Sequence, residues 1–293
     1  MNLLDYISEA ASSATGAATG WQDLRQEIHE KVARIPADVN EYGYDPWGFS
    51  PAAFENLLLP AALMYRYYFR VESLGLERLP EGRMLLIGNH AGQVAFDGMM
   101  VTAAMVLEAD PPRVARAMGE YWLGTLPWMN VLMDRMGSTV GTRETAVDLL
   151  DHGEAVLAFP EGVRGMNKVY SDAYTLKRFG LGFMRLALAT KTPIVPISIV
   201  GSEEQQPGLA NLEGIARSLG MPSFPVTLTF PWLGPFGLWP LPVRYHIEFG
   251  EPLYFSGSPA DEDDVVGAKV DQVKAAIQAG LDRGVERRQS IFL

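Results

Sequence analysis

From residue 83 onward, the sequence alternates short apolar runs with longer segments of helical periodicity. The apolar runs cover residues 84–89, 114–118, 155–160 and 194–201, and the helical segments cover residues 96–108, 143–150 and 179–189. Apolar runs of this length are typical of strands that are buried on both faces, and their alternation with helices favours parallel pairing. We therefore predict an α/β fold with a mixed, largely parallel sheet flanked by helices.

The last third of the chain adds two predicted strands, at residues 224–230 and 243–250, and a final helix over residues 261–281. Acidic residues at the start of that helix stabilise its positive end. Its apolar residues recur at helical spacing, which predicts a buried stripe made of Val266, Val270, Val273 and Ile277.

The first 75 residues differ from the rest of the chain. Residues 1–50 are predicted to form a polar helical arm, with Leu24, Ile28 and Val32 at helical spacing. Residues 51–75 are predicted to form an apolar helix, and residues 76–293 the α/β domain.

The most apolar and aromatic stretch of the sequence covers residues 54–71. Glu55, Pro60 and Arg66 interrupt it, and it is shorter than the roughly 20 apolar residues that a membrane span needs. Two structures fit this composition. One is a helix that packs into the core, and the other is an interfacial helix that lies in the headgroup layer of a membrane.

Composition excludes several classes of function. Cysteine is absent, so disulfides and thiolate chemistry are excluded, and the net charge of −11 without a basic stripe argues against nucleic-acid binding. The N-terminal residues lack the basic and apolar regions of a secretory signal, so we expect a cytoplasmic protein. No pair of histidines at helical spacing indicates a metal site.

Polar residues follow two of the predicted strands at the point where each ends. His90 follows residues 84–89, and Glu161 follows residues 155–160. Ligand sites in open α/β sheets form at such strand ends. A histidine can act as a general base near neutral pH when a carboxylate holds its other ring nitrogen, and Asp97 is the nearest candidate for that carboxylate.

Four ordered sequence blocks resemble those of the glycerolipid acyltransferase superfamily, which includes lysophosphatidate, glycerol-phosphate and monoacylglycerol acyltransferases. The resemblance covers residues 83–201, with an extension to residues 249–255. The blocks are Asn89-His90 with Asp97, residues 137–143 ending in Arg143, residues 159–164 with Glu161, Gly162 and Arg164, and Val195-Pro196.

This resemblance implies that His90 is the general base and that Asp97 supports it. It also implies that Arg143, Glu161, Gly162 and Arg164 bind the acceptor, whose phosphate would suit the paired donors of a guanidinium group. The implied donor is a thioester of coenzyme A or of acyl carrier protein, and no cofactor is expected.

The acceptors of this superfamily are membrane lipids, so we expect peripheral contact with the inner face of the membrane. Trp232, Phe236 and Trp239 lie in a proline-rich segment, where they form either an interfacial anchor or a buried aromatic cluster. The negative net charge favours apolar insertion over attraction to anionic lipid, so salt should weaken membrane binding little.

One feature departs from the family pattern: six residues separate His90 from Asp97, where four are usual. This spacing resembles the neutral-lipid branch of the superfamily, whereas Arg143 and Arg164 favour a phosphorylated acceptor. It also leaves open a lipid-binding or lipid-transfer protein without turnover, and a thioesterase-like hydrolase in which His90 activates water. The Gly-x-Ser-x-Gly signature of α/β-hydrolases is absent.

Overall fold

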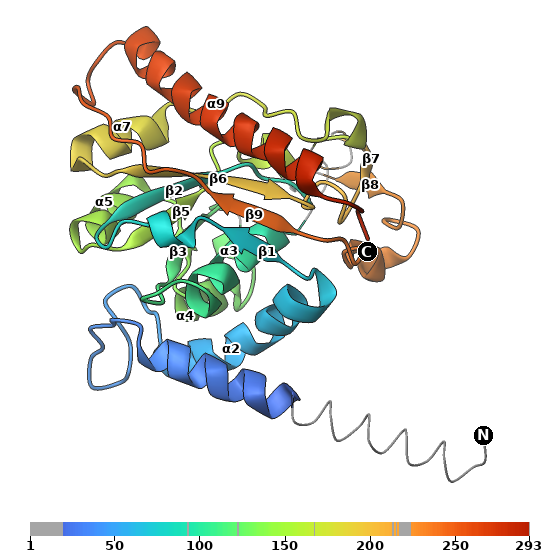
Figure 1. Cartoon of the computed structure of the whole chain (residues 1–293), viewed down its shortest axis with the longest axis horizontal. Coiled ribbons are helices and arrows are strands. Elements are labelled where there is room, and N and C mark those ends of the chain that lie inside the picture. Colours follow the sequence, from blue (N-terminus) through green and yellow to red (C-terminus); the bar gives the residue numbers. More distant parts are fainter. Residues whose placement is uncertain are drawn as a thin grey trace.

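A seven-stranded sheet forms the centre of the protein, as the computed structural model shows (Figure 1). The structure describes residues 20–292 except 93, 122, 167, 213, 215 and 217–223, so residues 1–19 of the predicted arm lie outside it. The strand order is β1-β9-β6-β2-β5-β3-β4. The strands are β1 (Glu72–Leu74), β2 (Met84–Gly88), β3 (Ala115–Gly119), β4 (Thr139–Val140), β5 (Ala155–Ala158), β6 (Ile194–Val200) and β9 (His246–Phe249).

Strand direction confirms the predicted mixed, largely parallel sheet. β6, β2, β5, β3 and β4 pair in parallel, as do β1 and β9. The β6–β9 pair is antiparallel. The carboxyl ends of β6, β2, β5, β3 and β4 therefore lie along one edge of the sheet, which is the place where such folds bind ligands.

Helices cover both faces of the sheet (Figure 1). One face is covered by α2 (Pro51–Leu63) and α3 (Phe96–Leu107), together with a helix of residues 20–33. The other is covered by α5 (Arg143–Asp151), α7 (Gly182–Thr190) and α9 (Asp263–Arg287). Two shorter helices are α4 (Met129–Arg135) and α6 (Val163–Met166).

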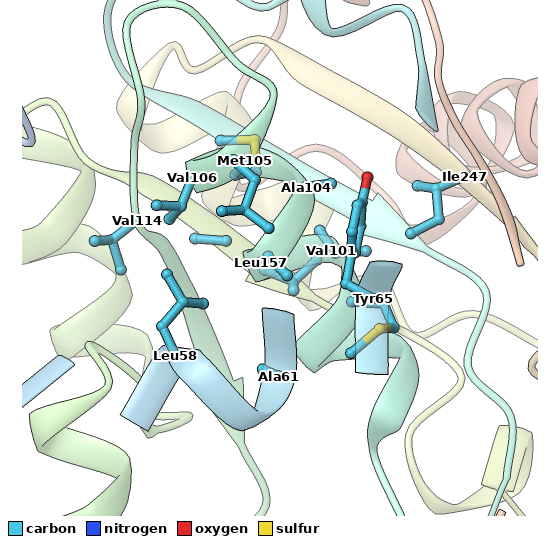
Figure 2. Packing of buried hydrophobic residues seen from close by; sticks show 14 of the residues in the cluster. Leu58, Ala61, Tyr65, Val101, Ala104, Met105, Val106, Val114, Leu157 and Ile247 are labelled. Carbon is cyan, nitrogen blue, oxygen red and sulfur yellow. The ribbon is translucent and has the colours of Figure 1, made fainter. Parts of the chain in front are cut away.

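Side chains of β2 alternate between two hydrophobic cores, because successive strand residues point to opposite faces. Met84 and Leu86 join the core beneath α2 and α3, part of which is shown in Figure 2. Leu85 and Ile87 join the core beneath α5, α7 and α9. With both faces buried, β2 needs the continuous apolar run by which the sequence predicts it.

The final helix confirms its predicted buried stripe. Val266, Val270, Val273 and Ile277 of α9 are all buried against the sheet, and the helix continues to Arg287, beyond its predicted end.

The helix of residues 20–33 buries Leu24, Ile28 and Val32 in the same core as α2 and α3. This core therefore contains residues from both sides of positions 50 and 75. The division of the chain at these positions stays a prediction. A buried ion pair also ties the N-terminal region to the sheet, since Arg116 Nη2 on β3 lies 2.6 Å from Asp45 Oδ2.

The apolar stretch of residues 54–71 folds as α2 followed by a π-helical turn, η1 (Met64–Tyr68). Phe54, Leu58 and Tyr65 are buried in the core, as the core-packing interpretation requires, whereas Tyr67 is exposed. Within the described ranges, no helix combines the length and apolar character needed to cross a membrane.

The sequence did not predict every element correctly. Residues 224–230 contain a strand, β8 (Pro225–Thr227), but it pairs with β7 (Gly208–Asn211) in a separate two-stranded sheet. The short strand β1 and the helix α4 were not predicted. Neither has the apolar periodicity on which the prediction depended, since β1 has only three residues and α4 buries none of its side chains.

Candidate active site

His90 lies just beyond the carboxyl end of β2, next to an asparagine that replaces part of the strand ladder. Asn89 Nδ2 donates to the carbonyl oxygen of Ile199 at 2.9 Å, and Asn89 Oδ1 accepts from the N–H of Ile199 at 2.8 Å. The amide group thus satisfies β6 where the backbone of β2 turns away. This fixes the place at which His90 leaves the sheet.

The imidazole of His90 is bonded to the carboxylate of Asp97. Nδ1 lies 2.7 Å from Asp97 Oδ2, which also accepts the backbone N–H of Ala91 at 3.0 Å. Asp97 Oδ1 accepts from the N–H of Gly98 at 2.8 Å. Asp97 stands in the first turn of α3, where the helix dipole favours a negative charge. With Nδ1 held in this way, Nε2 is the ring nitrogen that can exchange a proton with a substrate.

The loop between these two residues absorbs the wider spacing. Gly92 has a positive φ of 84°, and a Cβ there would lie 2.2 Å from Gln205 Nε2, so this close approach requires glycine. Further along the loop, the N–H of Val94 donates to Gln206 Oε1 at 3.3 Å. The loop packs against the residues after β6 while its two ends stay together. The six residues between His90 and Asp97 are therefore compatible with direct contact between the two side chains.

An aromatic ring supports the imidazole from one side. The rings of His90 and Phe159 stack with their centroids 4.4 Å apart and their planes 12° apart. Gly88 and Gly98 leave room for this ring, since a Cβ at either would lie 3.2 or 3.4 Å from Phe159. On the α6 side, a Cβ at Gly165 would lie 2.6 Å from the carbonyl oxygen of His90. The histidine is therefore held in one orientation by packing as well as by Asp97.

Glu161 is almost fully buried and binds the backbone on both sides of the site. Its Oε1 accepts from the N–H of His90 at 3.1 Å, and its Oε2 accepts from the N–H of Lys177 at 2.8 Å. It does not pair with Arg164. Glu161 thus positions the site, and a direct contact between its carboxylate and the acceptor remains a prediction.

Two charged residues that the sequence analysis missed complete the buried network. Lys168 Nζ lies 2.7 Å from Glu203 Oε1 and 3.5 Å from Glu161 Oε2, and all three side chains are buried. Glu203 follows β6 and obeys the same strand-end rule that singles out His90, so that rule could have found it. Lys168 follows a short helix with no apolar pattern, and no sequence signal marks it.

The predicted acceptor-binding arginines lie at the same edge of the sheet as His90. Arg164 precedes Gly165, which packs directly on His90, and Gly162 begins the same short turn. Arg143 starts α5 just after β4, three strands from β2, or about 14 Å at the usual strand spacing. Both arginines are exposed, and neither has a hydrogen-bond or ion-pair partner among the residues that the structure describes. The structure thus brings Arg164 close to His90 and leaves Arg143 farther away.

Lys177 and the three other histidines of the sequence also have local partners. Lys177 Nζ lies 2.6 Å from Asp172 Oδ2. His29 pairs with Glu55 and His246 with Glu72, at 3.1 and 3.3 Å, and the ring of His152 packs on Trp47.

Comparison with known proteins identifies the family. The Acyltransferase family profile matches residues 70–200, which include His90, Asp97 and the predicted acceptor-binding residues. An uncharacterized protein of Mycobacterium tuberculosis is 40% identical over 99% of this chain and 83% of its own length. A mouse protein described as a DGAT1/2-independent enzyme synthesizing storage lipids is 27% identical over 83% of this chain and 68% of its own length. The chain belongs to the glycerolipid acyltransferase superfamily.

A solved structure of this superfamily shares the fold. The 1-acyl-sn-glycerophosphate acyltransferase PlsC of Thermotoga maritima matches with a TM-score of 0.53, covering 82% of this chain and 83% of PlsC at 17% identity. The fold predicted from the alternation of apolar runs with helical segments is confirmed, and so is the superfamily that the sequence blocks resemble.

In this superfamily member, the surroundings of His90 raise its pKa above the usual value of 6.5. Burial alone would lower the pKa, but the charge of Asp97 and its hydrogen bond raise it, and the charge of Glu161 adds to them. Lys168 acts in the opposite direction. An imidazole in this environment holds a proton well once it has taken one.

Proposed function

We propose that this superfamily member transfers a fatty acyl chain from a thioester, acyl-CoA or acyl carrier protein, to a hydroxyl group of a glycerolipid or lysophospholipid. The observation that carries the proposal is the 2.7 Å contact between His90 Nδ1 and Asp97 Oδ2 at the carboxyl edge of the sheet. That contact leaves Nε2 as the site of proton exchange.

The chemistry needs only these groups and the two substrates. Nε2 of His90 takes the proton of the acceptor hydroxyl as its oxygen attacks the thioester carbonyl carbon, and Asp97 stabilises the imidazolium that forms. The new carbon–oxygen bond replaces the carbon–sulfur bond. His90 then gives the proton of the hydroxyl group to the leaving thiolate. No covalent acyl-enzyme is needed.

The positive charges of Arg164 and Arg143 favour an acceptor that carries a phosphate group. Arg164 and Arg143 are exposed at the edge that carries His90, and a guanidinium group can bind phosphate oxygens through paired hydrogen bonds. The short turn that contains Gly162 and Arg164 would place the acceptor beside the imidazole.

The test offers labelled acyl-CoA with lysophosphatidate, lysophospholipid, glycerol phosphate and monoacylglycerol in turn, with the products separated by chromatography. We expect labelled ester from a phosphorylated acceptor. Product from monoacylglycerol alone would contradict the phosphate assignment, and release of free fatty acid without any acceptor would indicate a thioesterase.

A matched pair of histidine variants tests the base. His90→Ala should lower kcat by about 10²–10⁴-fold, because the proton of the hydroxyl then has no acceptor. His29→Ala, which removes an exposed helical histidine, should leave kcat unchanged. A folded His90→Ala protein that retains normal turnover would exclude His90 as the base.

A further inference from the structure

Large apolar side chains are exposed along residues 228–239, here called the aromatic loop. Phe236 is 85% exposed and Trp232 is 72% exposed, and the loop also exposes Leu228, Leu233 and Trp239. Apolar patches of this kind are rare on monomeric proteins unless they contact another surface. The predicted alternative of a buried aromatic cluster is therefore wrong for Trp232, Phe236 and Trp239.

The backbone of the aromatic loop is held in place, so the exposed side chains are presented by a fixed structure. Thr227 and Phe230 bond to each other through backbone and side-chain groups, at 2.8 and 2.9 Å. Thr229 Oγ1 donates to the carbonyl oxygen of Gly237 at 2.7 Å, which closes the loop across its base.

The apolar surface continues onto the π-helical turn η1, which follows α2. Trp239 Nε1 donates to Tyr68 Oη at 3.1 Å, and the two rings meet edge to face. The neighbouring Tyr67 is also exposed. In Figure 1 the chain between β8 and β9 lies on the same side of the molecule as the carboxyl end of α2.

One side chain joins the aromatic loop to the loop that carries the candidate catalytic pair. Gln206 accepts from the N–H of Val94 and donates to the carbonyl oxygen of Leu238. The side chain of Gln206 thus bridges the aromatic loop and the segment between His90 and Asp97. A lipid held at that surface would lie beside the candidate site.

Charge distinguishes a lipid surface from a protein partner. The sequence has no charged residue from 218 to 243, although the whole chain has a net charge of −11. A protein interface usually surrounds its apolar centre with a polar rim, whereas tryptophan within an uncharged segment is typical of the boundary between headgroups and acyl chains. The negative net charge would also oppose binding to an anionic membrane.

We propose that the aromatic loop inserts into the surface of a zwitterionic lipid bilayer and places the candidate site over the membrane. The proposal deepens the proposed function, since it names the surface from which a lipid acceptor would be taken. It rests on the loop itself and can be tested without acyl transfer.

The experiment measures binding of the full chain to phosphatidylcholine vesicles, with no acyl donor present. Trp232→Ser with Phe236→Ser should weaken binding about 100-fold, since each inserted aromatic side chain contributes about tenfold or more. Tyr42→Ser with Tyr254→Ser is the matched control, because these rings are 74% and 75% exposed outside the loop. The control should bind as the wild type does, and 0.5 M salt should change binding little.

Three results would overturn the proposal: no binding of the wild type to these vesicles, equal binding by the loop variant, or a lipid-free oligomer that the loop variant abolishes. Turnover on a soluble short-chain acceptor is measured separately. Vesicle binding that depends on the loop, in a protein without acyl transfer, would support this proposal and contradict the proposed function.

Discussion

Two of the buried clusters of charged side chains on this sheet differ in whether they contain a group that can release a proton. The first, here called the edge cluster, contains His90, Asp97, Glu161, Lys168 and Glu203. The second, here called the Arg116 cluster, contains Arg116, Asp45 and Glu154.

The Arg116 cluster lies away from the carboxyl ends of the strands. Arg116 sits on β3 beside Val156 of β5, bonds two carboxylates and lies near the faces of Trp47 and Phe49. Burial would lower the pKa of this guanidinium, but its bonds to Glu154 and Asp45 raise it, so it stays charged.

The edge cluster contains a group that can gain and lose a proton, the imidazole of His90. His90 combines a raised pKa with a position just beyond the carboxyl end of β2. Both clusters therefore bury charged groups, but of the two only the edge cluster contains a side chain that can take up and release a proton. Location and titration together therefore identify the candidate site.

The largest expected difference comes from removing one buried carboxylate from each cluster. Asp97→Asn should lower kcat by about 10²–10⁴-fold, because the imidazolium loses its partner. It should also lower the pKa of His90 and move the acidic limb of the pH–rate profile to lower pH. Asp45→Asn should lower stability but leave kcat of the folded protein unchanged. Equal kcat values for both variants would remove the distinction between the clusters.

The next effect concerns stability in the Arg116 cluster. Arg116→Met should reduce the free energy of unfolding by about 3–5 kcal/mol, because two carboxylates lose their buried cation. Urea denaturation measures the loss, and turnover of the remaining folded protein should match the wild type. A drop in kcat at full folding would place Arg116 in the catalytic machinery.

A smaller effect is expected from packing at the edge cluster. Gly165→Ala should cost about 1–3 kcal/mol and lower kcat by about 10–100-fold, since the new methyl group pushes on the backbone of His90. Gly182→Ala adds the same group where no atom lies within 4 Å, and it should change neither quantity adversely. Similar behaviour of the two variants would show that His90 tolerates displacement.

The smallest effect is a pH dependence of stability. Because the folded pKa of His90 is raised, its contribution is fully present below the unfolded value of about 6.5 and is lost as pH rises through the folded pKa. The difference in unfolding temperature between wild type and His90→Gln should therefore shrink from acidic to alkaline pH. For Arg116→Met the difference should stay nearly constant over neutral pH.

Much of the fold was predictable because the central strands are buried on both faces. β2, β5 and β6 need continuous apolar runs, and a polar residue directly after such a run stands out, as His90 and Glu161 do. The three residues of β1 carry no such pattern, since β1 is defined by its pairing with β9, which is distant in sequence.

The candidate site was predictable where chemistry depends on residue type and was missed where it depends on tertiary contact. His90 and Asp97 have the residue types that proton transfer needs. Lys168 and Glu203 lie 35 positions apart in the chain and meet only because α6 folds back toward the end of β6. The positioning role of Glu161 also depends on backbone groups, which the sequence does not display.

The carboxylate of Asp97 bonds both ends of the loop that begins at Ala91, through the imidazole and N–H at one end and the N–H of Gly98 at the other. The contact between His90 and Asp97 therefore depends on the two ends of the loop and not on the residues inside it. We therefore expect that this loop can change in length and sequence while His90 and Asp97 stay in contact.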